Sequence, residues 1–208
     1  MNIAVFGASG QTGKLFVELA LEAGHHVTAL VRDPTKLGIN HPHLQIVNGD
    51  ALDKVAVEAT VQESQVIVST LGNVKGEPDD LLSASAENIL GAMHIFGVRR
   101  LIVCAPIHAR FEGDPRTFIQ RVLAFFQRLR RSRKVKPLTA FINLIKASDF
   151  DWTIVRLASL TGGAKTGKVR HGIFKPGKTS VSRADAAAFL MDQLTDTTYI
   201  RKAPMLAD

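Results

Sequence analysis

Three glycines near the start of the chain have the spacing of a turn that holds phosphate. Gly7, Gly10 and Gly13 follow the apolar run 2–6, and residues 14–21 then place apolar side chains at helical spacing. In such a turn the first glycine permits the tight bend, the second exposes the backbone, and the third lets the helix approach the strand. The pattern is GxxGxxG and not GxGxxG, so the prediction of a dinucleotide pyrophosphate site depends on its place between strand and helix.

The residues after the second expected strand bear on which dinucleotide would bind. Arg32 leaves this strand and Lys36 follows it. Together they could pair with a 2′-phosphate, which favours NADP(H) over NAD(H). Two alternatives stay open: Asp33 could accept a hydrogen bond from the ribose of NAD, or both cations could be solvated surface charges. After the third strand, Asp50 and Ala51 could contact the adenine, although Asp50 could also cap a helix.

Short β-branched apolar runs alternate with helical patterns along the chain. Strands are expected at residues 2–6, 26–31, 44–47, 65–70, 100–104 and 152–156. Helices are expected near residues 10–23, 51–59, 81–96, 115–131, 139–147 and 182–194, with Asp79, Asp80 and Ser182 as helix caps. This alternation predicts an α/β fold, a Rossmann-like doubly wound parallel sheet in three α/β/α layers, formed as one domain by residues 1–208.

Three segments interrupt the alternation. Residues 73–78 form a polar loop, residues 108–137 are longer than a crossover needs, and residues 161–178 contain five glycines. The first two follow the carboxyl ends of central strands, where open α/β sheets bind ligands. We therefore expect 108–137 to be a lid on the substrate side, and 161–178 to be a loop or hairpin over the same edge.

Positive charge is concentrated in the second of these segments. The net charge is +7, and residues 115–148 hold nine lysines and arginines but no aspartate or glutamate. Apolar residues from Phe118 to Leu129 recur at helical spacing, which predicts an amphipathic helix with a basic end. Three interpretations stay open: a lid with a solvated basic tail, a contact with a partner or a membrane surface through 116–136, and an anion site. Nucleic-acid binding is not expected, because no recognition motif accompanies the charge.

Other features bound the location and redox environment of the protein. No apolar run approaches the length of a membrane-spanning helix, and the first residues run into the glycine turn without the basic region of a signal peptide. The one cysteine, Cys104, has no partner within the chain, so a reducing, cytoplasmic location is expected. His41 and His43 lack further ligands nearby in the sequence, and no metal site is predicted.

A proton donor pair common among dehydrogenases is missing. A Tyr-x-x-x-Lys pair would protonate the oxygen of a reduced carbonyl, but the one tyrosine, Tyr199, is followed four residues later by Ala203. A flavin or quinone ring delocalises the charge that a hydride brings, so proximity in a dry pocket would suffice. His108 could polarise a substrate carbonyl or only bind its own loop. Cys104 is expected to be a packing residue.

Seven segments in order resemble the atypical short-chain dehydrogenases/reductases that bind NAD(P)H, and within them the flavin reductase or biliverdin-IXβ reductase family. They are GASGQTG, VTALVRDPTKL, VNGDAL, STLGN, AENILGAM, DFDWTIVR and SVSRADAAAFLMDQL. The resemblance covers nearly the whole chain. It implies a reductase of that fold and places cofactor contacts in four groups. The implied contacts are Gly7, Ser9, Gly10, Gln11, Thr12 and Gly13 for the pyrophosphate; Arg32, Lys36, Asp50 and Ala51 for the adenosine end; Leu71 and Gly72 for the ribose; and Cys104, Ala105, Pro106, Leu157, Ser159 and Leu160 around the nicotinamide.

Two positions depart from the biliverdin-reducing members. Pro106 stands where those members have a serine, and Ser159 stands where they have a histidine. Biliverdin is therefore disfavoured, and the catalytic residues are not assigned; His108 and Ser159 are the candidates. The sequence predicts an NADPH-dependent reductase whose small-molecule partner is a flavin, quinone or tetrapyrrole. A non-catalytic NADP(H)-binding redox sensor acting through a protein partner is the alternative.

Overall fold

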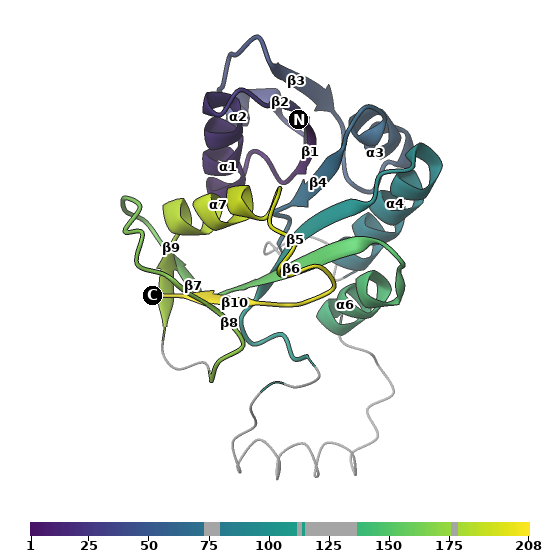
Figure 1. Ribbon diagram of the computed structural model, residues 1–208. Coiled ribbons are helices and arrows are strands. Elements are labelled where there is room, and N and C mark those ends of the chain that lie inside the picture. The colour runs from purple at the N-terminus through teal and green to yellow at the C-terminus, as the bar shows by residue number, and fades with distance from the viewer. Residues whose placement is uncertain (73–79, 112–113, 115–136, 176–178) are drawn as a thin grey trace.

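An eight-stranded sheet forms the centre of the computed structural model, which describes residues 1–72, 80–111, 114, 137–175 and 179–208 (Figure 1). Its strand order is β3-β2-β1-β4-β5-β6-β10-β8. The strands are β1 (Asn2–Phe6), β2 (His26–Val31), β3 (Leu44–Asn48), β4 (Val66–Ser69), β5 (Arg100–Pro106), β6 (Asp151–Leu157), β10 (Met205–Ala207) and β8 (Arg170–Gly172). All neighbouring pairs are parallel except β8 with β10. The predicted Rossmann-like doubly wound fold is confirmed, with one antiparallel strand added at the edge.

Helices cover both faces of this sheet, as Figure 1 shows. On one face lie α1 (Gln11–Glu22), α2 (Pro34–Leu37) and α7 (Arg183–Asp192), and on the other α3 (Lys54–Val61), α4 (Leu81–Phe96) and α6 (Pro137–Ala147). Phe16 of α1 and Leu190 of α7 are buried in the first layer, and Ile89 of α4 and Ile145 of α6 are buried in the second. Strands that are apolar on both faces therefore form the middle of three layers.

Short elements and helix starts depart from the predictions. α2 was not predicted; Asp33 caps it by accepting from the backbone of Thr35 at 3.0 Å. α3 begins three residues later than expected, because Asp50 binds the amide of Leu52 in a turn and Asp53 provides the cap. Asp80 is the cap residue of α4 as predicted, but its side chain makes no cap hydrogen bond; Asp79 lies outside the described residues. Ser182 caps α7 as predicted.

The glycine-rich part of the chain forms strands as well as loops. β8 lies within 161–178, and β7 (Ser159–Thr161) pairs in parallel with β9 (Ser180–Ser182) as a second, two-stranded sheet. Each of these strands has three residues, which is too short for an alternating pattern to predict. In the part of the chain that the structure describes, no helix is long and apolar enough to cross a membrane.

Asp185, on the first turn of α7, attaches this region to the helix. Its carboxylate accepts hydrogen bonds from Ser182 Oγ at 2.6 Å, from the amide of Gly167 at 2.9 Å, and from the amide and hydroxyl of Thr166 at 3.0 Å. The side chain is buried, with 2% of the residue exposed. The carboxylate therefore ties the loop that precedes β8 to the amino end of α7.

We expect Asp185→Asn to cost about 2 kcal/mol of unfolding free energy at neutral pH. Burial raises the pKa of this carboxyl, but the hydrogen bonds from Ser182, Thr166 and Gly167 outweigh burial and lower the pKa to about 2. Because the folded pKa lies below the unfolded value, the stabilisation is present above about pH 4 and is lost as the pH falls toward 2. Urea unfolding of both proteins across that range should show the difference shrinking. The exposed Asp192→Asn, on the same helix, is the control and should change stability little at either pH.

Candidate dinucleotide site and its cavity

The predicted glycine turn lies at the carboxyl ends of the neighbouring parallel strands β1 and β4, where the chain continues to β2 on one side of the pair and to β5 on the other. Gly7 has a φ of +79°, and a Cβ on it would lie 2.8 Å from Thr70 Oγ1 and 3.0 Å from the amide of Leu71. A Cβ on Gly13 would collide with the carbonyl oxygen of Gly7. A methyl group at either position is therefore incompatible with the close packing of β1, α1 and the end of β4.

Thr70 holds this turn, a role that the sequence analysis missed. Its hydroxyl lies 3.1 Å from the carbonyl oxygen of Gly7 and 3.3 Å from that of Phe6. The amide of Thr70 also donates to Phe6, at 2.9 Å. The signal in the sequence was a hydroxyl residue directly after the apolar β4, but its partners are more than sixty residues away.

The amino end of α1 suits an anion. Gly10 is the cap residue, and in the described chain no side chain bonds to the first amides of the helix. Ser9, Gly10 and Gln11 are exposed beside these amides. Free amides and the positive end of the helix dipole form a phosphate-binding site, so the residues present fit a dinucleotide pyrophosphate.

The residues predicted for the adenosine end lie close together after β2 and β3. Arg32 Nη1 is 3.8 Å from Asp50 Oδ2, and the two side chains are 60% and 37% exposed. Lys36 is in the last turn of α2. Asp33 uses Oδ1 for both the amide and the hydroxyl of Thr35, and these hydrogen bonds lower the pKa of its carboxyl. One oxygen of the Asp33 carboxylate is therefore committed to the cap of α2.

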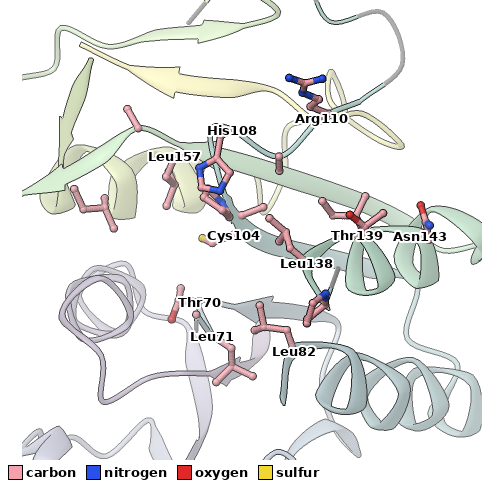
Figure 2. A pocket seen from close by; sticks show the side chains of 18 of the residues that line it. Thr70, Leu71, Leu82, Cys104, His108, Arg110, Leu138, Thr139, Asn143 and Leu157 are labelled. Atoms are coloured by element: carbon pink, nitrogen blue, oxygen red, sulfur yellow. The ribbon is translucent and has the colours of Figure 1, made fainter. Parts of the chain in front are cut away.

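A cavity of about 1090 Å³ opens at the carboxyl ends of β4, β5 and β6. Figure 2 shows side chains from these strand ends and from the starts of α4 and α6 converging on one space. Eight of its lining residues were predicted as cofactor contacts: Thr12, Leu71, Gly72, Cys104, Ala105, Pro106, Leu157 and Leu160. Ser159 is not among the lining residues; its amide pairs with Thr179 in the small sheet.

Of the residues in the far wall of the cavity, His108 was predicted as a catalytic candidate and the others were not assigned to the site. This wall comes from the chain just after β5 and from α6, and includes His108, Ala109, Arg110, Leu138, Thr139, Ile142, Asn143 and Lys146. The helix itself was expected from its periodicity. Which of its faces would turn to the site could not be predicted, because that depends on how α6 packs beside α4.

Titratable groups at the cavity differ in what they can do. Burial raises the pKa of the Cys104 thiol to about 12, so it stays protonated at neutral pH and serves as a packing residue. His108 is exposed on the wall, close to Cys104 in Figure 2. The hydroxyl of Tyr199 lies 2.7 Å from His171 Nδ1, and Tyr199 is not among the lining residues. Among the residues that the structure describes, no three His, Cys, Asp or Glu side chains gather closely enough for a metal ion.

A buried arginine fixes the chain that forms the far wall. Arg156 of β6 has 0% exposure and donates to Asp114 through both terminal nitrogens, at 2.6 and 2.8 Å. It also donates to the carbonyl oxygens of Ala109 and Ala203, each at 2.9 Å. The guanidinium carbon lies 4.8 Å from the ring centroid of Phe111. The side chain of Arg156 therefore attaches residues 109–111 and 114 to β6 of the sheet.

Fold and site together define a dinucleotide-binding Rossmann protein, and the comparisons agree. A family model described as NAD(P)H-binding matches residues 7–197. An uncharacterized chloroplastic protein of Arabidopsis thaliana is 31% identical over 207 residues, covering 93% of this chain and 71% of the relative. A phenylcoumaran benzylic ether reductase of Nicotiana tabacum is 32% identical over 96 residues, covering 41% of this chain and 31% of that protein. ChuY of Escherichia coli O157:H7, described as an anaerobillin reductase, has a TM-score of 0.74, 24% identity and coverage of 99% and 96%.

This chain belongs to the NAD(P)H-binding family. Of what was expected for an atypical short-chain dehydrogenase/reductase, NAD(P)H binding and the Rossmann fold are confirmed. The narrower resemblance to flavin or biliverdin-IXβ reductases stays a prediction. The basic helix expected at 115–131 lies outside the described residues, as does the whole segment 116–136 assigned to a partner or membrane contact.

Proposed function

We propose that the protein is an NAD(P)H-dependent reductase that transfers hydride to a flavin, quinone or similar conjugated acceptor, without a tyrosine–lysine pair. When bound, the cofactor supplies the hydride. The observation that carries the proposal is which side chains line the cavity. The chain's one tyrosine bonds to His171 and is not a lining residue, and the lining groups that titrate are Cys104, His108, Arg110 and Lys146.

The chain's own residues would bind and orient both reactants. The turn from Gly7 to Gly13 would hold the pyrophosphate, and the apolar walls formed by Leu71, Leu157 and Leu160 would exclude water from the ring faces. The reduced ring delocalises its charge, so solvent at the exposed His108 side can deliver the proton. The partial similarity to a named reductase and the fold shared with ChuY support this class of reaction.

Turnover of purified protein tests the proposal directly. We expect oxidation of NADPH, followed by its absorbance, with FMN or menadione as acceptor. Tyr199→Phe should turn over as fast as the parent, because this hydroxyl lies outside the cavity wall. Tight NADPH binding without turnover on a panel of flavins and quinones would contradict the proposal and favour a non-catalytic sensor. A large loss of rate in Tyr199→Phe would indicate that this tyrosine donates a proton, and would contradict that part of the proposal.

We also propose that NADP(H) is preferred, through Arg32 and Lys36. Arg32→Ala is expected to weaken NADPH about tenfold to a hundredfold and to leave NADH affinity nearly unchanged, since a guanidinium forms strong paired hydrogen bonds with a phosphate. Fluorescence titration with both nucleotides measures this. Lys54→Gln, an exposed lysine on α3, is the control. An equal loss for the two nucleotides would contradict the preference.

A further inference from the structure

The far wall of the cavity carries positive charge. Arg110 and Lys146 both line it and are exposed, and so is His108, which follows the end of β5. No aspartate or glutamate is found among its described lining residues. Neither Arg110 nor Lys146 forms an ion pair with a carboxylate in the described part of the chain. This side of the cavity therefore favours a negatively charged group.

The polar residues of α6 share one face of the helix. Thr139, Asn143 and Lys146 are spaced by four and three residues, so their side chains lie along one side, and all three line the cavity. Figure 2 shows Thr139 and Asn143 on this helix, and Arg110 on the chain that leaves β5. A hydroxyl and an amide thus accompany the two cations, and both can donate hydrogen bonds to an anionic oxygen.

Phe111 connects Lys146 to the stretch of chain that carries Arg110. Lys146 Nζ lies 5.7 Å from the centroid of the Phe111 ring, and Phe111 directly follows Arg110 in the sequence. The other neighbour of that ring is the guanidinium of Arg156, which also holds Ala109 and Asp114. Because buried hydrogen bonds fix the backbone on both sides of Arg110, this residue is presented from an anchored stretch of chain opposite α6.

We propose that Arg110 and Lys146 form a subsite for a phosphate or carboxylate carried by the hydride acceptor, with Thr139 and Asn143 as further donors. This rests on the proposed reductase function and narrows it: the preferred acceptor is a conjugated ring with an anionic substituent. The glycine turn serves the cofactor's pyrophosphate from α1, whereas this subsite is formed by α6 and the residues after β5. The two anion sites thus receive different molecules.

FMN and riboflavin are a matched pair for the test, because they share one ring system and differ by a phosphate. With NADP⁺ present, FMN is expected to bind about tenfold more tightly than riboflavin, measured by quenching of flavin fluorescence. In turnover the preference should appear in KM more than in kcat, since the phosphate is bound equally before and during the reaction. The preference should weaken as salt is raised, because both cations are exposed.

The double variant Arg110→Gln with Lys146→Gln should bring the ratio of FMN to riboflavin affinity close to one. Lys165→Gln removes an exposed lysine that does not line the cavity, and it should keep the parent ratio. Equal affinity for the two flavins in the parent protein, an unchanged ratio in the double variant, or binding of neither flavin would overturn the subsite. Binding with the expected ratio but no turnover would retain the subsite and reject the reductase function.

Discussion

Asp114→Ala is expected to lower the unfolding free energy by about 3–5 kcal/mol, one of the two largest effects in this protein. The substitution removes both carboxylate oxygens that pair with a guanidinium that has no exposure to solvent. A buried charge left without its counter-ion costs far more than a surface pair contributes. Urea unfolding would show the loss as a lower midpoint at an unchanged slope.

The control is a second arginine–aspartate pair that differs in burial. Asp149 lies 3.9 Å from Arg99, and its side chain is 81% exposed. Asp149→Ala should therefore change the unfolding free energy by less than about 1 kcal/mol. Similar losses in both variants would show that burial of Arg156 does not determine the effect. Asp114→Ala should also raise the KM for FMN, because the backbone beside Arg110 loses an attachment.

Gly13→Ala is expected to abolish tight cofactor binding and to cost about 1–3 kcal/mol of stability. The new methyl group would meet the carbonyl oxygen of Gly7 and would lie 2.7 Å from Thr70 Oγ1. Both are held by hydrogen bonds at the switch point of the sheet, so α1 must move outward and its amides leave the position that suits a pyrophosphate. Titration with NADPH and thermal unfolding measure the two effects.

Gly91→Ala provides the matched control on another helix. Gly91 is exposed in the middle of α4, and a Cβ on it would meet nothing within 4 Å. Alanine at such a site favours the helix by about 0.5–1 kcal/mol, so the two substitutions should change stability in opposite directions. A stable Gly13→Ala protein with parent affinity for NADPH would contradict the role assigned to the turn.

Elements with long, regular patterns were predicted closely. The strand 2–6, the helix 81–96 and the glycine turn all depend on residues adjacent in sequence, and local spacing alone indicates them. The three-residue strands and α2 were missed because each is too short to repeat a recognisable pattern. The start of α3 was misplaced because Asp50 and Asp53 compete as caps, and local hydrogen bonds decide between them.

The sequence by itself determined the class of fold and the position of a dinucleotide turn, since Gly7, Gly10 and Gly13 act through the backbone of one short segment. It also bounded the chemistry, because a chain with a single tyrosine and no lysine four residues beyond it lacks the usual proton donor pair. The tertiary structure decided the far wall of the cavity. Asp114 meets Arg156 across 42 positions, and Lys146 reaches Phe111 only because α6 packs beside α4. Such contacts depend on how helices and strands pack against one another in the tertiary structure, which no local sequence pattern encodes.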